Sequence, residues 1–180
     1  LLLAFSGCSP IINRFLARAF SQLGAPIASV KHKVSDPVLS SAGLSILWVG
    51  HATTLIQIND KVFITDPLFT KTVGMLMRRS IEAGLDPSTL SRIDYTLISH
   101  IHLDHFSYGS LDMLPKNGKL LVPLGALRYT PDFEFREIRE LTPWDALEED
   151  GVRITAVPVQ HFSGRYGFDT PWTRDLGYTG

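Results

Sequence analysis

The chain has 180 residues, of which 44% are hydrophobic and 19% are charged, and this composition suits one globular domain with a hydrophobic core. The formal net charge of −1 provides no broad basic surface, so we expect no nucleic-acid partner. The single cysteine, Cys8, excludes an intrachain disulfide and a cysteine-rich zinc site.

The first residues have the pattern that ends a bacterial lipoprotein signal segment. Residues 1–5 are apolar, and small residues precede Cys8, as a signal-peptidase pocket requires. The pattern predicts that a signal segment ends within residues 1–8, that Cys8 is lipidated, and that the protein is anchored to a membrane of the bacterial cell envelope. A cytoplasmic protein with a buried Cys8 thiol is the alternative. The apolar run is far shorter than the roughly 20 residues of a transmembrane helix.

Residues 9–43 are expected to form an N-terminal helix followed by a linker. Ser9 can cap this helix, Pro10 suits its first turn, and apolar side chains recur along one face. That apolar stripe either packs on the domain or, beside a lipid anchor, lies on a membrane surface. Residues 25–43 have the composition of an extended arm, with His32 exposed to solvent.

The remaining residues, 44–180, show the alternation of strands and helices that is typical of a layered α/β domain. Apolar alternation bounded by turn residues predicts strands at 44–48, 53–58, 61–65, 93–99, 119–122, 135–141 and 151–159. Two short helices are predicted at 86–90 and 107–114. We expect this domain to be truncated at its C-terminal end.

The most informative segment is residues 100–105, His-Ile-His-Leu-Asp-His, which holds three of the six histidines and an aspartate. Imidazole and carboxylate groups are ligands that zinc prefers. The segment follows a predicted buried strand, and open α/β sheets place their sites at such strand ends. The pattern therefore predicts a metal site, with a solvated polar loop as the alternative. The candidate ligands are His100, His102, Asp104 and His105.

His161 follows a second predicted strand and can bring a third imidazole to the same edge of the sheet. With His100 and His102 it would form a three-nitrogen face for one ion, with one position open for water. Asp104 and His105 point elsewhere by their spacing and can serve a second ion about 3.5–4 Å away.

His51 and Asp66 stand at two other strand ends. His51 either supports the metal site or contacts the substrate, or it satisfies buried backbone groups. Asp66 either orients a ligand imidazole through its other ring nitrogen or only forms the turn before Pro67.

Four short motifs carry a resemblance to a known family. They are Gly-His-Ala-Thr at 50–53, Thr-Asp-Pro-Leu-Phe at 65–69, the histidine motif at 100–105 and Pro-Val-Gln-His-Phe-Ser-Gly-Arg at 158–165. The histidine motif resembles the signature of the metallo-β-lactamase superfamily. All four motifs, in this order, resemble the branch that contains N-acyl-phosphatidylethanolamine phospholipase D and similar bacterial hydrolases.

The resemblance implies an α/β fold, the metallo-β-lactamase-like αββα sandwich, of which this chain would hold about the N-terminal half. It also implies two zinc ions, and His and Asp side chains suit manganese and iron as well. The resemblance places His100, His102 and His161 on the first ion, and Asp104 and His105 on the second.

Two family ligands, a bridging aspartate and a last histidine, are not found in the sequence. Asp169 and Asp175 lie too close to His161 to replace them. We therefore expect an incomplete second metal site, a fragment that is inactive by itself, and an exposed apolar face on the sheet.

The resemblance predicts a metal-dependent hydrolase of a phosphodiester, such as an N-acyl-phosphatidylethanolamine-like phospholipid, or of another small molecule. A metal-bound hydroxide would attack phosphorus, while Asp104 orients it and takes up a proton. Arg165 either contacts an anionic group of the substrate or is an ordinary surface residue. The alternatives are a lactone, ester or amide hydrolase of the same superfamily and a non-catalytic metal-binding lipoprotein.

Overall fold

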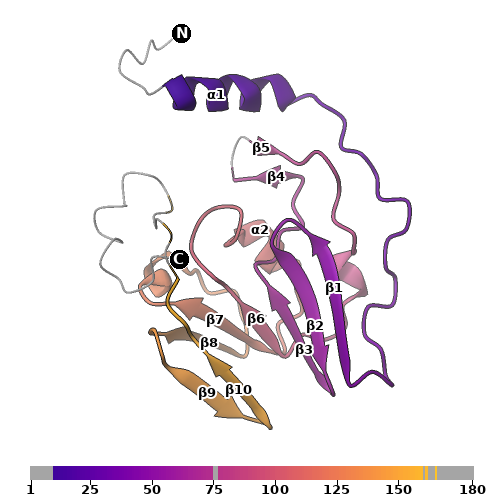
Figure 1. Ribbon diagram of the computed structural model, residues 1–180, viewed down its shortest axis with the longest axis vertical. Helices are drawn as coiled ribbons and strands as arrows, with labels where there is room; N and C mark the ends of the chain where they lie inside the picture. Colours follow the sequence, from indigo (N-terminus) through magenta and orange to yellow (C-terminus); the bar gives the residue numbers. More distant parts are fainter. Residues whose placement is uncertain (1–9, 75–76, 160, 162–164, 166–180) are drawn as a thin grey trace.

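A six-stranded mixed sheet organises the fold (Figure 1). The computed structural model describes residues 10–74, 77–159, 161 and 165. The strand order across the sheet is β1–β2–β3–β6–β7–β8. These strands span Leu44–Gly50, Thr53–Ile58, Lys61–Thr65, Tyr95–Leu97, Lys119–Pro123 and Glu137–Leu141.

The first three strands pair antiparallel, whereas β3, β6, β7 and β8 run parallel to one another. The carboxyl ends of β1, β3 and β6 therefore meet at one edge of the sheet. A tight turn at Asn59, with a φ angle of 52°, joins β2 to β3. Between β1 and β2, Gly50 has a φ angle of 128°, a region that favours glycine, and His51 follows with 55°.

Hydrophobic clusters cover both faces of the sheet. The larger cluster packs the short helix α2 (Tyr108–Asp112) and neighbouring loops on one face, where Ile64, Phe106 and Leu120 are fully buried. The smaller cluster lies on the other face and is covered by a hairpin of β9 (Ala146–Glu149) and β10 (Val152–Thr155). Its contacts include the stacked rings of Phe63 and Tyr95, whose centroids are 5.1 Å apart.

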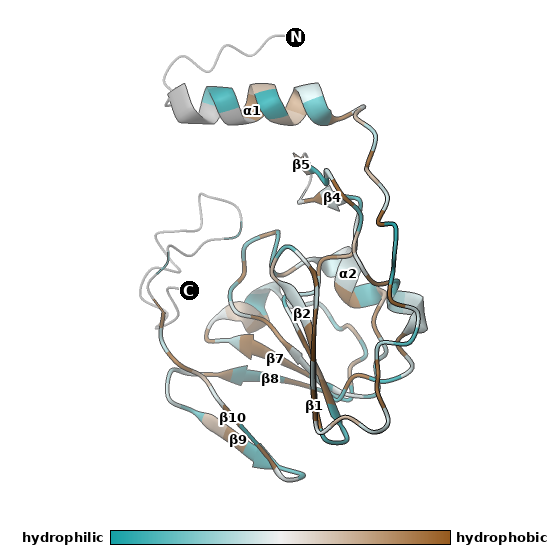
Figure 2. Ribbon diagram, turned by 45° about the vertical axis from the view of Figure 1, so that its right-hand side comes forward, coloured by the Kyte–Doolittle hydropathy of each residue, from teal (hydrophilic) through white to brown (hydrophobic). Residues whose placement is uncertain are grey.

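The hairpin does not cover the outer strand β1 on this face. Leu44, Ile46 and Trp48 alternate along β1 and are 63–71% exposed. Figure 2 shows β1 as a largely hydrophobic ribbon at the side of the sheet. The exposed apolar face expected from the sequence is therefore present.

The N-terminal helix α1 (Pro10–Gln22) connects through the extended arm to β1 and lies near a small hairpin of β4 (Thr72–Val73) and β5 (Met77–Arg78). The Arg78 guanidinium donates a hydrogen bond of 3.1 Å to the carbonyl oxygen of Leu23. Ala19 is buried, whereas Phe20 stays 59% exposed. Among the described residues, no helix combines the length and the apolar character that a membrane crossing requires.

The strand predictions hold best in the main sheet, and several elements outside it differ from expectation. The predicted helix at 86–90 is a single 3-10 turn, Pro87–Thr89, and a second such turn spans Ala126–Tyr129. The predicted strand 151–159 ends at Thr155, because among the described residues it pairs with the four-residue β9 alone. The short hairpins that contain β4 and β9 were not predicted.

Candidate metal centre

The candidate centre lies at the sheet edge where β1, β3 and β6 end. The β6 strand is followed by Ser99 and then by the histidine loop, residues 100–105. This loop closes on itself, since the backbone N–H groups of His105 and Phe106 both donate to the carbonyl oxygen of His102, at 3.1 and 2.8 Å. The fold thereby holds the side chains of one short loop in fixed directions.

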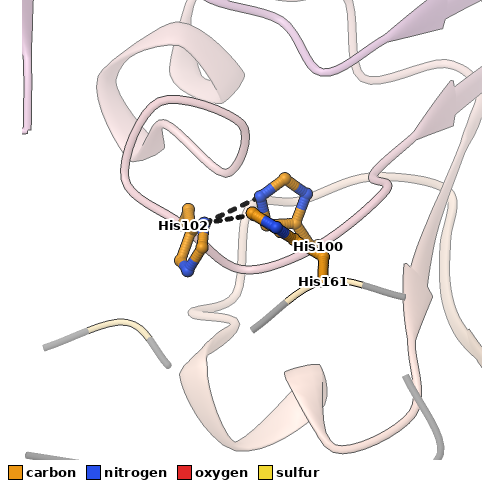
Figure 3. Close-up of side chains that lie close together, drawn as sticks. All are labelled: His100, His102 and His161. Carbon is orange, nitrogen blue, oxygen red and sulfur yellow. Dashed lines mark hydrogen bonds between the residues drawn. The ribbon is translucent and has the colours of Figure 1, made fainter. Parts of the chain in front are cut away.

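Three imidazoles converge at this loop (Figure 3). Nδ1 of His102 lies 2.9 Å from Nε2 of His100 and 3.2 Å from Nε2 of His161. These residues offer ligand atoms that lie within 4.8 Å of one another. His161, which is 59 residues beyond His102 in the sequence, thus lies beside the histidine loop. It does not stand at a strand end as expected, because β10 already ends at Thr155.

The arrangement of these nitrogens fits a metal ion better than a hydrogen-bond network. One ring nitrogen has either one in-plane lone pair or one hydrogen, so Nδ1 of His102 cannot make two good hydrogen bonds at once. Two ligand nitrogens on a tetrahedral zinc ion lie about 3.3 Å apart, given zinc–nitrogen bonds of about 2.0–2.1 Å. The observed separations of 2.9 and 3.2 Å are close to that value.

The protonation state of His100 also suits a metal ligand. Burial lowers the pKa of His100 to about 4, and the nearby charges of His105 and His102 act in the same direction. The imidazole is therefore neutral at neutral pH, and a ring nitrogen binds a cation only in that form.

A second group of ligand atoms lies next to the first. Oδ2 of Asp104 is 3.0 Å from Nε2 of His51 and 3.6 Å from Nε2 of His105. The ligand atoms of these residues also lie within 4.8 Å of one another. The rings of His100 and His105 are 3.9 Å apart between centroids, so the two groups adjoin.

His51 is a member of this second group. Its side chain is exposed and points to Asp104, so the alternative that it satisfies buried backbone groups is wrong. The turn at Gly50 carries His51 from the end of β1 towards the histidine loop. Because the two residues are 53 positions apart, no local pattern in the sequence connects them.

Asp66 contacts the second group through His105. One oxygen, Oδ2, lies 2.9 Å from Nδ1 of His105 and accepts a hydrogen bond of 2.6 Å from the Ser99 hydroxyl. The other, Oδ1, accepts one of 2.7 Å from the Ser99 backbone N–H. The carboxylate thereby directs Nε2 of His105 towards Asp104, which is the orienting arrangement considered for Asp66 from the sequence.

The charges in the second group stabilise one another. Burial acts to raise the pKa of Asp104, but the charge of His105 and hydrogen bonds from the backbone and His51 outweigh it and lower the pKa. Burial acts to lower the pKa of His105, but the hydrogen bond and charge of Asp66 raise it. The carboxylate of Asp104 is therefore ionised at neutral pH and available as a ligand.

Arg165 corrects an expectation from the sequence. It is 6% exposed, so it is not an ordinary surface arginine. Its Nη1 donates to the carbonyl oxygens of Ile101 and Phe106, at 3.0 and 2.9 Å, and its guanidinium lies 4.0 Å from the ring centre of Tyr108. Arg165 therefore binds two carbonyl groups in and next to the histidine loop. Its contact with an anionic group of the substrate stays a prediction.

Four other residues were considered from the sequence, and the structure describes one of them. Cys8, Asp169 and Asp175 lie outside the described residues. His32 is exposed on the extended arm, as expected.

Comparisons with known proteins agree with this geometry. The family model described as "Beta-lactamase superfamily domain" matches residues 61–179. The N-acyl-phosphatidylethanolamine-hydrolyzing phospholipase D 1 of Caenorhabditis elegans is 29% identical over 77% of this chain and 43% of its own length. A metal-dependent hydrolase of Roseobacter denitrificans is 28% identical over 75% of this chain and 57% of its own length.

Among solved structures, an isothiocyanate hydrolase from Delia radicum gut bacteria has a TM-score of 0.52 and 22% identity, over 73% of this chain and 54% of that chain. This likeness concerns the fold. The chain spans between 35% and 57% of the length of the curated relatives it matches. The mixed α/β sheet is thus about the N-terminal half of a metallo-β-lactamase-like fold, and the chain belongs to the β-lactamase superfamily domain family.

Proposed function

We propose that the protein is a metal-dependent hydrolase that acts on a phosphodiester. The observation that carries this proposal is the convergence of two adjoining ligand groups at one sheet edge, one of three imidazoles and one of two imidazoles and a carboxylate. Adjoining groups of this kind are typical of two-metal hydrolytic sites. The phospholipase D named among the relatives supports a phosphodiester as the substrate.

In this proposal the first ion is held by His100, His102 and His161, and the second by His51, Asp104 and His105. We propose zinc for both ions, because imidazole nitrogen and carboxylate oxygen are among its usual ligands. When bound, such ions acidify water and stabilise negative charge that develops on a phosphoryl group.

The side chains around the ions have separate tasks. Asp66 holds His105 in one orientation, because its carboxylate accepts a hydrogen bond from Nδ1 of His105. Nε2 of His105 is then directed at the site. Oδ2 of Asp104 lies 3.0 Å from Nε2 of His51, and both atoms would face the second ion. The other carboxylate oxygen of Asp104 would then be the one that can accept a proton. Arg165 keeps the histidine loop in its folded geometry.

Hydrolysis of bis-p-nitrophenyl phosphate by the full-length protein tests the proposal. We expect turnover that needs added zinc and falls by at least about a hundredfold in Asp104→Asn, in the range found for general acid–base groups. Asp112→Asn, on the exposed surface of α2, is the matched control and should keep full activity. Turnover of p-nitrophenyl acetate without turnover of the phosphodiester would favour an acyl hydrolase, and no bound metal would favour a binding protein.

We further propose that a lipidated Cys8 places this activity at a bacterial membrane, where a phospholipid substrate is within reach. The support is the small-residue pattern before Cys8. We expect Cys8→Ala to move the full-length protein from the membrane fraction to the soluble fraction. Unchanged membrane retention would contradict acylation at this residue.

A further inference from the structure

A groove of about 530 Å³ opens beside the candidate metal centre, with His51 on its border. Its walls come from the extended arm, β1, the loop after β3 and the segment around β4 and β5. Most of the lining is apolar, from the side chains of Val34, Leu47, Trp48, Leu68, Val73 and Ile81. A groove of this kind suits a hydrocarbon chain.

The guanidinium of Arg79 lies in this mostly apolar lining, in which the described residues also include His32. Nε of Arg79 donates to the Ile81 carbonyl oxygen at 3.1 Å, and Nη1 donates to the Leu68 carbonyl oxygen. A Cβ atom added at Gly50 would lie 3.3 Å from Nη2, so this end of the guanidinium reaches the turn that carries His51. The two carbonyls fix the guanidinium and leave Nη2 directed at the border between groove and metal centre.

The charge of Arg79 is not balanced by an acid in the described part of the chain, where no carboxylate lies within 4.0 Å of its nitrogens. Glu82, an acidic residue of the lining, pairs instead with Lys33 at 2.7 Å and accepts from the Val30 backbone N–H at 2.8 Å. Arg79 is partly buried, and this burial lowers the pKa of its guanidinium. A half-buried guanidinium without an acid partner is suited to bind an anion, because Arg presents several donors to phosphate or carboxylate oxygens.

We propose that this groove binds an amphiphile, with Arg79 on its anionic group and the apolar walls around its alkyl chain. This inference rests on the proposed function, because it makes the groove the substrate subsite of the metal centre. The substrate class is then a phosphate ester that carries an alkyl or acyl chain. The alkyl or acyl chain lies in the groove, and Arg79 holds the phosphate at the border with the metal centre.

Calorimetric binding of octyl phosphate to the full-length protein tests the proposal, with metal removed by a chelator so that the ions do not capture the phosphate. We expect Arg79→Gln to weaken octyl phosphate binding about tenfold or more, the effect of losing a charge-assisted contact. Octyl glucoside, which has the same chain and no charge, should bind equally to both proteins. Arg128→Gln, at an exposed arginine, is the matched control.

Because Arg79 also donates to two carbonyl oxygens, Arg79→Gln can fold poorly for a structural reason, so a second variant is needed. Ile81 lines the groove and is 58% exposed, so Ile81→Gln should fold normally and weaken octyl phosphate and octyl glucoside alike. Octanoate in place of octyl phosphate shows whether a carboxylate satisfies the same site. Binding that is unchanged in both variants, or absent in the wild type, would overturn the proposal.

The test separates this inference from the proposed function because binding is measured without turnover. If octyl phosphate binding depends on Arg79 but the protein hydrolyses no phosphodiester, the groove proposal stands and the proposed function is contradicted. If the protein hydrolyses a phosphodiester but octyl phosphate binding does not depend on Arg79, the proposed function stands and the groove proposal is contradicted.

Discussion

Replacing Arg165 by methionine should loosen the histidine loop and destabilise the whole domain. Arg165 gives hydrogen bonds from a charged group to Ile101 and Phe106, at 3.0 and 2.9 Å, and each such bond contributes about 1.5–3 kcal/mol. The contact with the Tyr108 ring, at 4.0 Å, adds about 1 kcal/mol. Because all these contacts share one side chain, they do not add fully, and we expect a loss of about 3 kcal/mol.

Thermal unfolding of the metal-free protein, followed by circular dichroism, measures this loss. At about 2–4 °C per kcal/mol for a domain of this size, Arg165→Met should lower the Tm by roughly 6–12 °C. Arg165→Lys should recover only part of the loss, since an ammonium group lacks the planar fork and the stacking face of a guanidinium. Arg139→Met, at an exposed residue of β8, is the control. An Arg165→Met protein with the Tm of the wild type would refute the idea that this residue clamps the loop.

Further predictions concern other parts of the fold. Asp66→Asn should weaken binding of the second metal ion about 10–100-fold, because the amide orients His105 less well than the carboxylate does. A zinc titration measures this affinity, and an unchanged value would contradict the role of Asp66. Glu149→Gln should cost about 1 kcal/mol above pH 4.5, because Lys119, 2.6 Å away, lowers the pKa of Glu149 by hydrogen bonding. Because the pKa of Glu149 is lower in the folded protein than its unfolded value of 4.5, the ionised carboxylate stabilises the folded state above pH 4.5. In urea unfolding of the wild type, this contribution to the free energy of unfolding should disappear as the pH falls below 4.5. Gly118→Ala should destabilise by more than about 3 kcal/mol, because its Cβ would lie 2.0 Å from a backbone carbonyl oxygen, and normal thermal stability of this variant would count against the packing described.

The parts of the fold that follow local patterns were predictable from the sequence. The strands of the main sheet alternate or are continuously apolar, and turn residues such as Asn59 bound them. The position of the histidine loop at a strand end follows from the buried run before it. His161 also lies beside that loop, but the rule for parallel strands does not explain it, since β10 ends at Thr155 and pairs with β9 outside the main sheet.

Other features depend on contacts between distant residues and left no local signal. The β9 strand, Ala146–Glu149, has a composition that suits a helix, and it is a strand because it pairs with β10 and buries Leu147 against Phe63 and Tyr95. The burial of Arg165 depends on carbonyl groups 59 and 64 residues away. The groove at Arg79 likewise exists only because the extended arm folds back beside β1.

In the proposed centre, three imidazoles from two distant segments hold one metal ion. Zinc titration of the metal-free full-length protein by calorimetry tests it most directly, with His102→Ala compared against His32→Ala, a change at the exposed arm histidine. We predict that the tightest zinc site is lost in His102→Ala and unchanged in His32→Ala. Equal zinc binding by the two variants would contradict the assignment of the centre.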